Sequence, residues 1–153
     1  MDALMVMNTE ETRAEATGIT EVIADLISRA RATGGVVAFV SAPVAPGAPE
    51  LPESVFEVGD DLGLVSESAD AFDGVDDLAA GLHDLAVDRI IIGGVDVQEA
   101  IRHTAMAALA CNFDVIVLAD GTRDLSGTPV EWLSDAEESG AMIKDVADVW
   151  LRM

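Results

Sequence analysis

The sequence is poor in cysteine and in basic residues, and it has no long hydrophobic run. Its 153 residues include one cysteine and eight lysines and arginines, of which Lys144 is the single lysine. One cysteine excludes a disulfide framework and any Cys-rich zinc or iron–sulfur centre. No apolar stretch approaches the roughly 20 residues of a membrane span, and the amino-terminal region lacks a signal-peptide pattern. We therefore expect a cytoplasmic protein.

Acidic residues dominate the charge. The chain carries 29 aspartates and glutamates and a formal net charge of −21. Such a surface repels phosphate groups and anionic lipid headgroups, so we expect neither nucleic acid nor membrane as a partner. A carboxylate-rich, lysine-poor surface also suits a cytoplasm of high salt, because salt screens the self-repulsion. A halophilic source is one hypothesis, and an acidic protein from a GC-rich genome is the other.

Short apolar runs alternate with amphipathic segments. Half of the residues are hydrophobic, which is enough for a core, and the length fits one domain over residues 1–153. The runs that predict strands are Ala3–Met7, Val36–Val40, Val55–Val58, Leu62–Val65, Arg89–Ile92, Val115–Leu118 and Ala141–Ile143. Helices are predicted from Ile19 to Thr33, over Gly74–Leu85, Val97–Leu109 and Glu131–Glu138, and from Asp145 onward.

Continuous apolar strands that alternate with helices predict a Rossmann-like α/β fold. We expect three α/β/α layers around a mostly parallel sheet of about six strands. Ala3–Met7 and Arg89–Ile92 should be adjacent central strands, because their apolar character requires burial on both faces. Ligands of such sheets bind beyond the carboxyl ends of the strands. No glycine-rich nucleotide motif follows a strand, so no cofactor is predicted.

The remaining titratable groups admit simple structural interpretations. Asp96, Glu99 and His103 could form a metal set, but Asp96 also fits a helix cap and Glu99 favours a helix amino terminus. His83 has acidic neighbours and is expected to face solvent. Cys111 closes an alanine-rich helix and fits a small packing group. No metal site is predicted.

The segment Asp88–Asp120, DRIIIGGVDVQEAIRHTAMAALACNFDVIVLAD, resembles the isochorismatase-like cysteine hydrolase family. This family includes isochorismatases, nicotinamidases and N-carbamoylsarcosine amidohydrolases. Upstream, Ala71–Leu78 is similar to the family's S-A-F-x-G-T-x-L element, and Ala3–Asn8 to its A-L-L-V-I-D opening. The resemblance covers most of the chain and thins across Ser41–Glu57 and after Thr122. It implies the family's isochorismatase-like α/β fold.

The family's catalytic triad is degenerate in this sequence. The resemblance puts the nucleophilic cysteine on Ala100, the aspartate base on Asn8 and the lysine on Ser66. An alanine has no nucleophile to activate, and an amide cannot accept a proton as a base, so the covalent route is closed. The family's metal site also lacks counterparts, because Ser41–Pro52 contains no histidine or aspartate.

Several functions stay open on these grounds. The first is a catalytically inactive structural, scaffold or regulatory subunit in a homo-oligomer or a protein complex, with an active paralogue as one candidate partner. The second is a hydrolase of a small amide- or vinyl-ether-type substrate, with Asp96 or Glu99 activating water. The third is a small-molecule-binding protein, favoured if a pocket stays open beside the degenerate triad. The pocket candidates are Asn8, Ser66, Phe72, Val95, Asp96 and Ala100.

Overall fold

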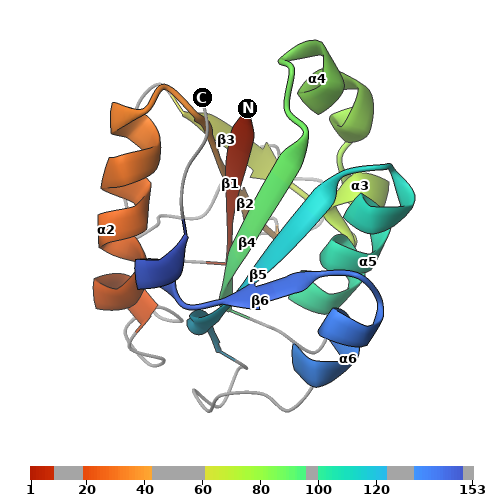
Figure 1. Ribbon diagram of the computed structural model, residues 1–153. Helices are drawn as coiled ribbons and strands as arrows, with labels where there is room; N and C mark the ends of the chain where they lie inside the picture. Colours follow the sequence, from red (N-terminus) through yellow and green to blue (C-terminus); the bar gives the residue numbers. More distant parts are fainter. Residues whose placement is uncertain (9–18, 43–60, 96–99, 124–132, 150–153) are drawn as a thin grey trace.

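Six parallel strands form a single sheet with helices on both faces (Figure 1). The computed structural model describes residues 1–8, 19–42, 61–95, 100–123 and 133–149. The strand order is β3-β2-β1-β4-β5-β6, and the predicted three-layer α/β fold is confirmed. The elements are β1 (Asp2–Met7), α2 (Ile19–Ala32), β2 (Val36–Ser41), β3 (Leu62–Val65), α3 (Ala71–Gly74), α4 (Leu78–Asp84), β4 (Arg89–Val95), α5 (Arg102–Ala110), β5 (Asp114–Arg123), α6 (Leu133–Glu138), β6 (Met142–Lys144) and the 3-10 turn η2 (Val146–Asp148).

The two central strands are β1 and β4, as the apolar runs predict. They pair in parallel from Asp2 opposite Arg89 to Met7 opposite Gly94. Every residue of both strands is buried, because side chains alternate between two covered faces. β1, β2 and β4 therefore end side by side, at the edge of the sheet where parallel α/β folds bind ligands.

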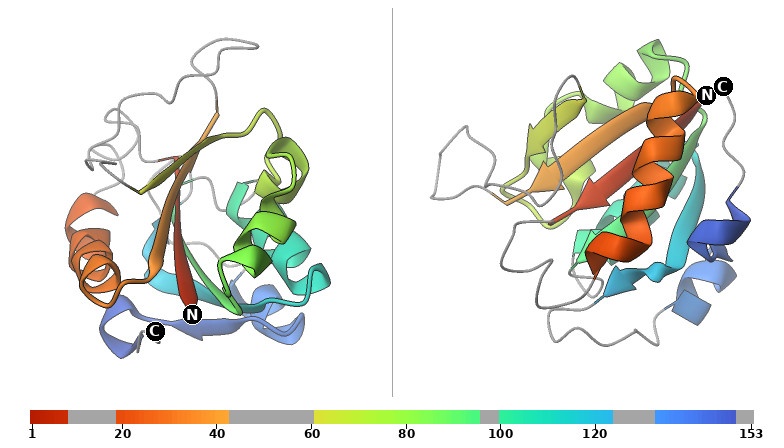
Figure 2. Two further views of the ribbon diagram at one scale, coloured as in Figure 1. Left: turned by 90° about the horizontal axis from the view of Figure 1, so that it is seen from above. Right: turned by 90° about the vertical axis from the view of Figure 1, so that its left-hand side faces the viewer.

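Each face of the sheet has its own hydrophobic core. Met5 and Met7 belong to the core shared with α4, α5 and α6, whereas Leu4 and Val6 belong to the core under α2 and η2. Figure 2 shows α2 crossing one face of the sheet, with the other helices gathered on the opposite face. None of the described helices is long and apolar enough to cross a membrane.

The predicted helix over Gly74–Leu85 is wrong in its extent. The chain forms two short helices there, α3 and α4, because Val75 is extended and Asp77 takes a left-handed conformation with φ of 56°. The apolar spacing of Val75, Leu78 and Leu82 continues across this break, so it could not reveal it. Val75 and Leu82 pack on the same core.

The ends of two other predicted helices also differ. α5 begins at Arg102, after a π-helical turn at Ala100 and Ile101, and residues 97–99 lie outside the described residues. The segment from Asp145 forms only the 3-10 turn η2 within the described residues. The predicted strand Val55–Val58 lies outside the described residues.

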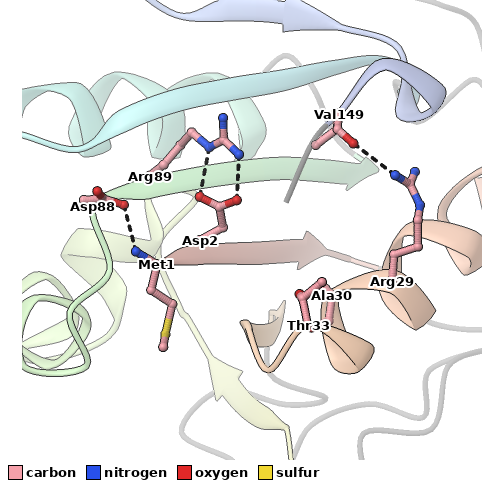
Figure 3. A network of polar contacts seen from close by, with 8 residues as sticks. All are labelled: Met1, Asp2, Arg29, Ala30, Thr33, Asp88, Arg89 and Val149. Carbon is pink, nitrogen blue, oxygen red and sulfur yellow. Dashed lines mark hydrogen bonds and ion pairs between the residues drawn. The ribbon is translucent and has the colours of Figure 1, made fainter. Parts of the chain in front are cut away.

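Polar contacts join the elements near the amino ends of the central strands (Figure 3). Arg89 binds the carboxylate of Asp2 through two hydrogen bonds, Nε to Oδ1 at 2.9 Å and Nη2 to Oδ2 at 2.6 Å. Both side chains are buried. Beside α2, Arg29 donates to the backbone oxygens of Val146 and Val149 at 2.8 and 3.0 Å. These contacts join β1 to β4 and the chain after β6 to α2.

Candidate functional site

A cavity of about 220 Å³ lies at the carboxyl ends of β1, β2 and β3. Asn8 follows β1, Ser41 ends β2, Ser66 follows β3, and Ala100 precedes α5. These are the strand ends to which the fold directs ligands. Three of the predicted pocket residues, Asn8, Ser66 and Ala100, thus meet on one cavity. Among the described residues, its lining consists of Met7, Asn8, Val40, Ser41, Ala42, Ser66, Glu67, Ser68, Ala69 and Ala100.

Asn8 closes β1 in a left-handed conformation, with φ of 54°. Asparagine tolerates this region better than most residues. Its backbone N–H donates to Val40 O at 2.8 Å, and its side-chain Nδ2 donates to Val95 O at 3.2 Å. An ionised carboxylate accepts hydrogen bonds but cannot donate them. The contact between the ends of β1 and β4 therefore depends on the amide.

Ser66 is buried, and its hydroxyl proton is engaged in a hydrogen bond. Its Oγ donates to Ser68 O at 2.7 Å, and its backbone N–H donates to Ser41 O at 3.0 Å. The Oγ also lies only 1.9 Å from where a Cβ on residue 74 would stand, so Gly74 is required for the fit. A side chain of serine size fills this place without blocking the cavity.

Ala100 presents only a methyl group to the cavity. It is 5% exposed and belongs to the core beneath α5. Close by, Gly94 has φ of 126°, and a Cβ there would lie 2.1 Å from Met7 O. This close backbone approach admits only glycine. The ends of β1 and β4 are thus held tightly beside Ala100.

The wall of the cavity after β3 is held from α5. Thr104 is completely buried and its Oγ1 accepts a hydrogen bond from the Ala71 N–H at 3.0 Å. The same hydroxyl donates to Ala69 O at 3.3 Å. Ser68 Oγ in turn accepts from the Asp70 N–H at 3.2 Å. The segment that lines the cavity is therefore fixed by its own hydrogen bonds and by a buried hydroxyl.

The other pocket candidates lie elsewhere. Val95 is buried in the core on the α2 face, and only its backbone oxygen reaches Asn8. Phe72 is half-buried on the other face, with its ring centroid 6.0 Å from that of Phe113. Neither residue lines the cavity. Asp96 lies outside the described residues.

The histidines and the cysteine are not at the cavity. His83 is exposed, stacks on Phe113 at 4.3 Å and lies with Nε2 3.2 Å from Cys111 O. Cys111 is half-buried. His103 is exposed on α5, where it lines a separate surface concavity with Arg102 and Met106.

Several lining residues escaped the sequence analysis. Glu67, Ser68 and Ala69 form one wall, and Ala42 lies at the end of β2. The rule that strand ends bind ligands was the available signal, since these residues directly follow β2 and β3. This rule identifies the end of a strand, but it does not say how many of the residues after that strand line the cavity.

The described residues do not fit the metal site of the resembled family. They contain no group of three or more histidine, cysteine, aspartate or glutamate side chains that could hold a metal ion. Among the lining residues that the structure describes, Glu67 is the one ionisable side chain. One carboxylate does not provide the three or four protein ligands that zinc takes. The described residues of the cavity therefore do not fit a zinc ion.

The comparisons with known proteins identify the family. The isochorismatase domain model matches residues 1–147. The chain belongs to the isochorismatase family. Among solved structures, N-carbamoylsarcosine amidase from Thermoplasma acidophilum is similar with a TM-score of 0.80 and 21% identity, covering 97% of this chain and 98% of that one.

Two further solved structures support the same fold. An isochorismatase family protein from Desulfovibrio vulgaris has a TM-score of 0.79 and 21% identity, covering 95% and 94% of the two chains. Pyrazinamidase of Pyrococcus horikoshii, solved in complex with zinc, has a TM-score of 0.77 and 22% identity, covering 94% and 98%. No curated protein sequence matches significantly. At these identities the likeness to solved structures shows the fold alone.

Proposed function

We propose that this isochorismatase-family protein binds a small molecule in the strand-end cavity and does not hydrolyse it by the family's cysteine route. One observation carries the proposal: the three degenerate triad positions surround an open cavity of about 220 Å³. A cavity filled by side chains would instead have favoured a purely structural role. The open cavity supports binding at this place, and the three triad positions present an amide, a hydroxyl and a methyl group to it.

The hydrogen bonds around the cavity support a role without covalent chemistry. The Asn8 amide donates to Val95 O, and the Ser66 hydroxyl donates to Ser68 O. A catalytic base must accept a proton from the nucleophile, and a nucleophile must have a base within reach. Ala100 offers no such atom, and the two polar groups are used to hold the backbone.

A hydrolase that uses other groups is the second candidate. It is favoured by the names of the structural neighbours, which include a pyrazinamidase and an N-carbamoylsarcosine amidase. In that case a carboxylate such as Glu99, outside the described residues, would activate water directly. Such a mechanism also requires donors that stabilise the charge on the attacked oxygen.

Ligand binding and ammonia release measured on the same sample test the proposal. The probes are the compact amides nicotinamide, pyrazinamide and N-carbamoylsarcosine. A ligand at 100 times its Kd stabilises the folded state by about 2.7 kcal/mol, which is a rise in Tm of roughly 5–10 °C for a domain of this size. We expect such stabilisation with at least one probe and no ammonia above background.

Blocking variants locate the binding. Ala100→Leu fills the cavity from the core side, and Ala69→Trp covers it from its exposed rim. Both should abolish the stabilisation, whereas Ala110→Trp, on the exposed side of α5, should keep it. Binding that survives both blocking variants contradicts the proposal. Ammonia release that is lost in Glu99→Ala would establish the hydrolase instead.

We also propose that the protein acts in an oligomer or with a partner protein. A subunit that binds a ligand without catalysing a reaction fits a homo-oligomer or a complex with an active paralogue. Ligand binding in the cavity would then regulate that partner. Native mass measurement of the complex from its source, with its components identified, tests this. A free monomer under those conditions contradicts the regulatory-subunit form of the proposal and leaves ligand binding to be judged by the experiment above.

A further inference from the structure

The outer face of α5 differs from the surface of the other helices. Among the helices that the structure describes, α5 is the one whose sequence contains no aspartate or glutamate. Its exposed residues recur at helical spacing along one side, and they are Arg102, His103, Met106 and Ala110. On the opposite face of the sheet, α2 exposes Glu21 and Asp25. A chain with 29 acidic residues thus has a helix face without carboxylates.

A concavity of about 600 Å³ lies at the amino-terminal end of this face. Its lining among the described residues is Asp70, Arg102, His103, Met106 and Ala107. The Asp70 carboxylate caps α3, where its Oδ1 accepts the Phe72 N–H at 2.9 Å. Met106 is 43% exposed although it is a large apolar side chain. The concavity therefore combines two basic side chains with an apolar one, beside an alanine that permits close approach.

The other end of the same face is acidic. Figure 1 shows α5 between α3 and α6, and α5 contacts both helices. The end of α6 lies beside the later part of α5, since a Cβ on Gly140 would stand 4.0 Å from Leu109 Cδ2. Glu137 and Glu138 end α6 and are exposed. Asp114 is also exposed, where the chain passes from α5 into β5. Three carboxylates thus surround the carboxyl-terminal end of α5.

The charge changes sign along α5, over roughly 12 Å from Arg102 to Ala110 at ~1.5 Å per residue. His83, with Nε2 3.2 Å from Cys111 O, is followed by the exposed Asp84 and leaves this end acidic. We propose that the outer face of α5 pairs with the same face of a second copy of this chain, with the two α5 helices antiparallel about a two-fold axis. The antiparallel arrangement places the basic end of each copy against the acidic end of the other.

Charge complementarity favours a second copy as the occupant of this face. A net charge of −21 on each chain makes copies repel each other where acidic surfaces meet, whereas here each copy offers a basic end to an acidic one. Met106 adds an adaptable apolar contact. A stable interface takes roughly 800 Å² from each partner, more than a nine-residue helix presents, so the flanking helices α3 and α6 also take part. The inference rests on the homo-oligomer proposed above and requires no ligand in the cavity.

Reversing the charge of each end separately tests the pairing. Arg102→Glu reverses the basic end, His103→Glu is a second variant at that end, and Glu137→Arg reverses the acidic end. Sedimentation equilibrium measures the dimer in about 0.15 M KCl, where a Debye length of ~8 Å screens the net charges of two copies more than the contacts between them. We expect a dimeric parent and at least about tenfold weaker pairing of each variant, because like charges then face each other at both symmetry-related contacts.

An equimolar mixture of two variants should restore the pairing. In a heterodimer of Arg102→Glu with Glu137→Arg, the new carboxylate of one chain faces the new guanidinium of the other. At the symmetry-related contact, the unchanged Glu137 faces the unchanged Arg102. Both contacts are then attractive, although each variant repels its own copies. Native mass spectrometry with one chain isotope-labelled identifies the heterodimer. Variants that stay monomeric when they are mixed overturn the inference.

Matched controls make the same changes in net charge on α2. Ala24→Glu combined with Ala32→Glu adds as much negative charge as Arg102→Glu, and Glu21→Arg adds as much positive charge as Glu137→Arg. All three positions are exposed on the other face of the sheet. We expect these controls to pair as the parent does. Weakening of the dimer by the controls to the same extent overturns the inference, because the net charge would then decide the pairing.

The failure of the proposed homo-oligomer has a different signature from the failure of its surface. A parent that stays monomeric at about 1 mM, where even a contact of millimolar Kd is populated, refutes both. A dimer that all the charge reversals leave intact refutes only the surface. A monomeric parent whose native complex loses a different protein on Arg102→Glu overturns the second copy as the occupant. Ala110→Trp should break the dimer and keep the stabilisation by a cavity ligand, so pairing and ligand binding are judged separately.

Discussion

The two ends of the central strands treat polar groups in opposite ways. At the amino end, β1 and β4 begin with Asp2 and Arg89, two charged groups that are buried and joined by two hydrogen bonds. At the carboxyl end, the same strands finish at Asn8 and Val95, joined by one neutral amide-to-carbonyl bond beside a cavity. Among the described residues, the buried charges are those of Asp2 and Arg89, and each neutralises the other. At the site end, the groups that join the two strands are uncharged and lie beside an open cavity.

The largest expected effect comes from breaking the amino end. Arg89→Met leaves the Asp2 carboxylate buried without its cation, and we expect a loss of about 3–5 kcal/mol in the free energy of unfolding. Urea denaturation monitored by circular dichroism measures it. The double variant Asp2→Leu with Arg89→Met should recover most of the loss, because it removes both charges. An Arg89→Met variant whose free energy of unfolding lies within about 1 kcal/mol of the parent's contradicts the comparison.

Placing a charge at the carboxyl end of the strands should lower the free energy of unfolding by less than Arg89→Met does. Asn8→Asp removes the donor to Val95 O and buries a carboxylate, which costs about 1–3 kcal/mol at neutral pH. Burial favours the protonated form of a carboxyl, so the pKa in the folded variant lies above its value in the unfolded chain. The folded state then binds the extra proton, and the deficit should shrink as the pH falls below neutrality.

The matched control is Asn112→Asp. Asn112 also has a positive φ, of 68°, but it is exposed at the end of α5. Surface substitutions of this kind stay within about 0.5 kcal/mol. Urea unfolding of both variants at two pH values gives the comparison. Equal losses at Asn8 and Asn112, or a deficit at Asn8 that does not change with pH, would show that the cavity end tolerates charge.

A smaller effect is expected at the cavity wall. Thr104→Val keeps the shape of the side chain and removes the hydroxyl that binds the Ala71 N–H and Ala69 O. We expect a loss of about 1–2 kcal/mol, together with weaker binding of amide probes, because Ala69 lines the cavity. Thr104→Ser keeps the hydroxyl and should restore the binding. Equal probe affinity in the valine and serine variants would limit Thr104 to a structural role.

The smallest expected effect is the response of stability to salt, which should differ between exposed and buried charges. The acid-rich surface repels itself at low salt, where the Debye length is ~30 Å at 0.01 M, and is screened at ~1 M, where it is ~3 Å. Tm should therefore rise with KCl by a few degrees, about 2–4 °C for each kcal/mol gained. The loss caused by Arg89→Met should stay constant with salt. Stabilisation by sulfate without any effect of KCl would remove the support for a halophilic origin.

The strands could be predicted from the sequence because buried strands consist of short, continuous apolar runs. Arg89–Ile92 and Ala3–Met7 read as doubly buried strands, and they pair at the centre of the sheet. The break between α3 and α4 was not predictable, since it depends on the backbone at Val75 and Asp77 while the apolar spacing continues through it. The spacing of apolar residues indicates which face of a helix is buried. A single residue in the left-handed conformation does not change that spacing.

The candidate site was predictable only in part. The strand-end rule and the family resemblance place Asn8, Ser66 and Ala100 at one site, and the structure puts all three on one cavity. Val95 also lies at a strand end, but side chains alternate along a strand, and its own turns to the α2 face. The wall at Ser68 and Ala69 depends on how a loop is held by a residue more than thirty positions away, which no local pattern contains.

The fit between Ser66 and Gly74 has an evolutionary consequence. A Cβ at position 74 would stand 1.9 Å from the Ser66 Oγ and 3.0 Å from both the Ser66 Cβ and the Ser68 N. The constraint acts in one direction, because residue 66 can lose its hydroxyl while Gly74 stays, whereas residue 74 cannot gain a Cβ while Ser66 stays in this position. Position 74 is therefore expected to keep its glycine for longer than position 66 keeps its serine as substitutions accumulate.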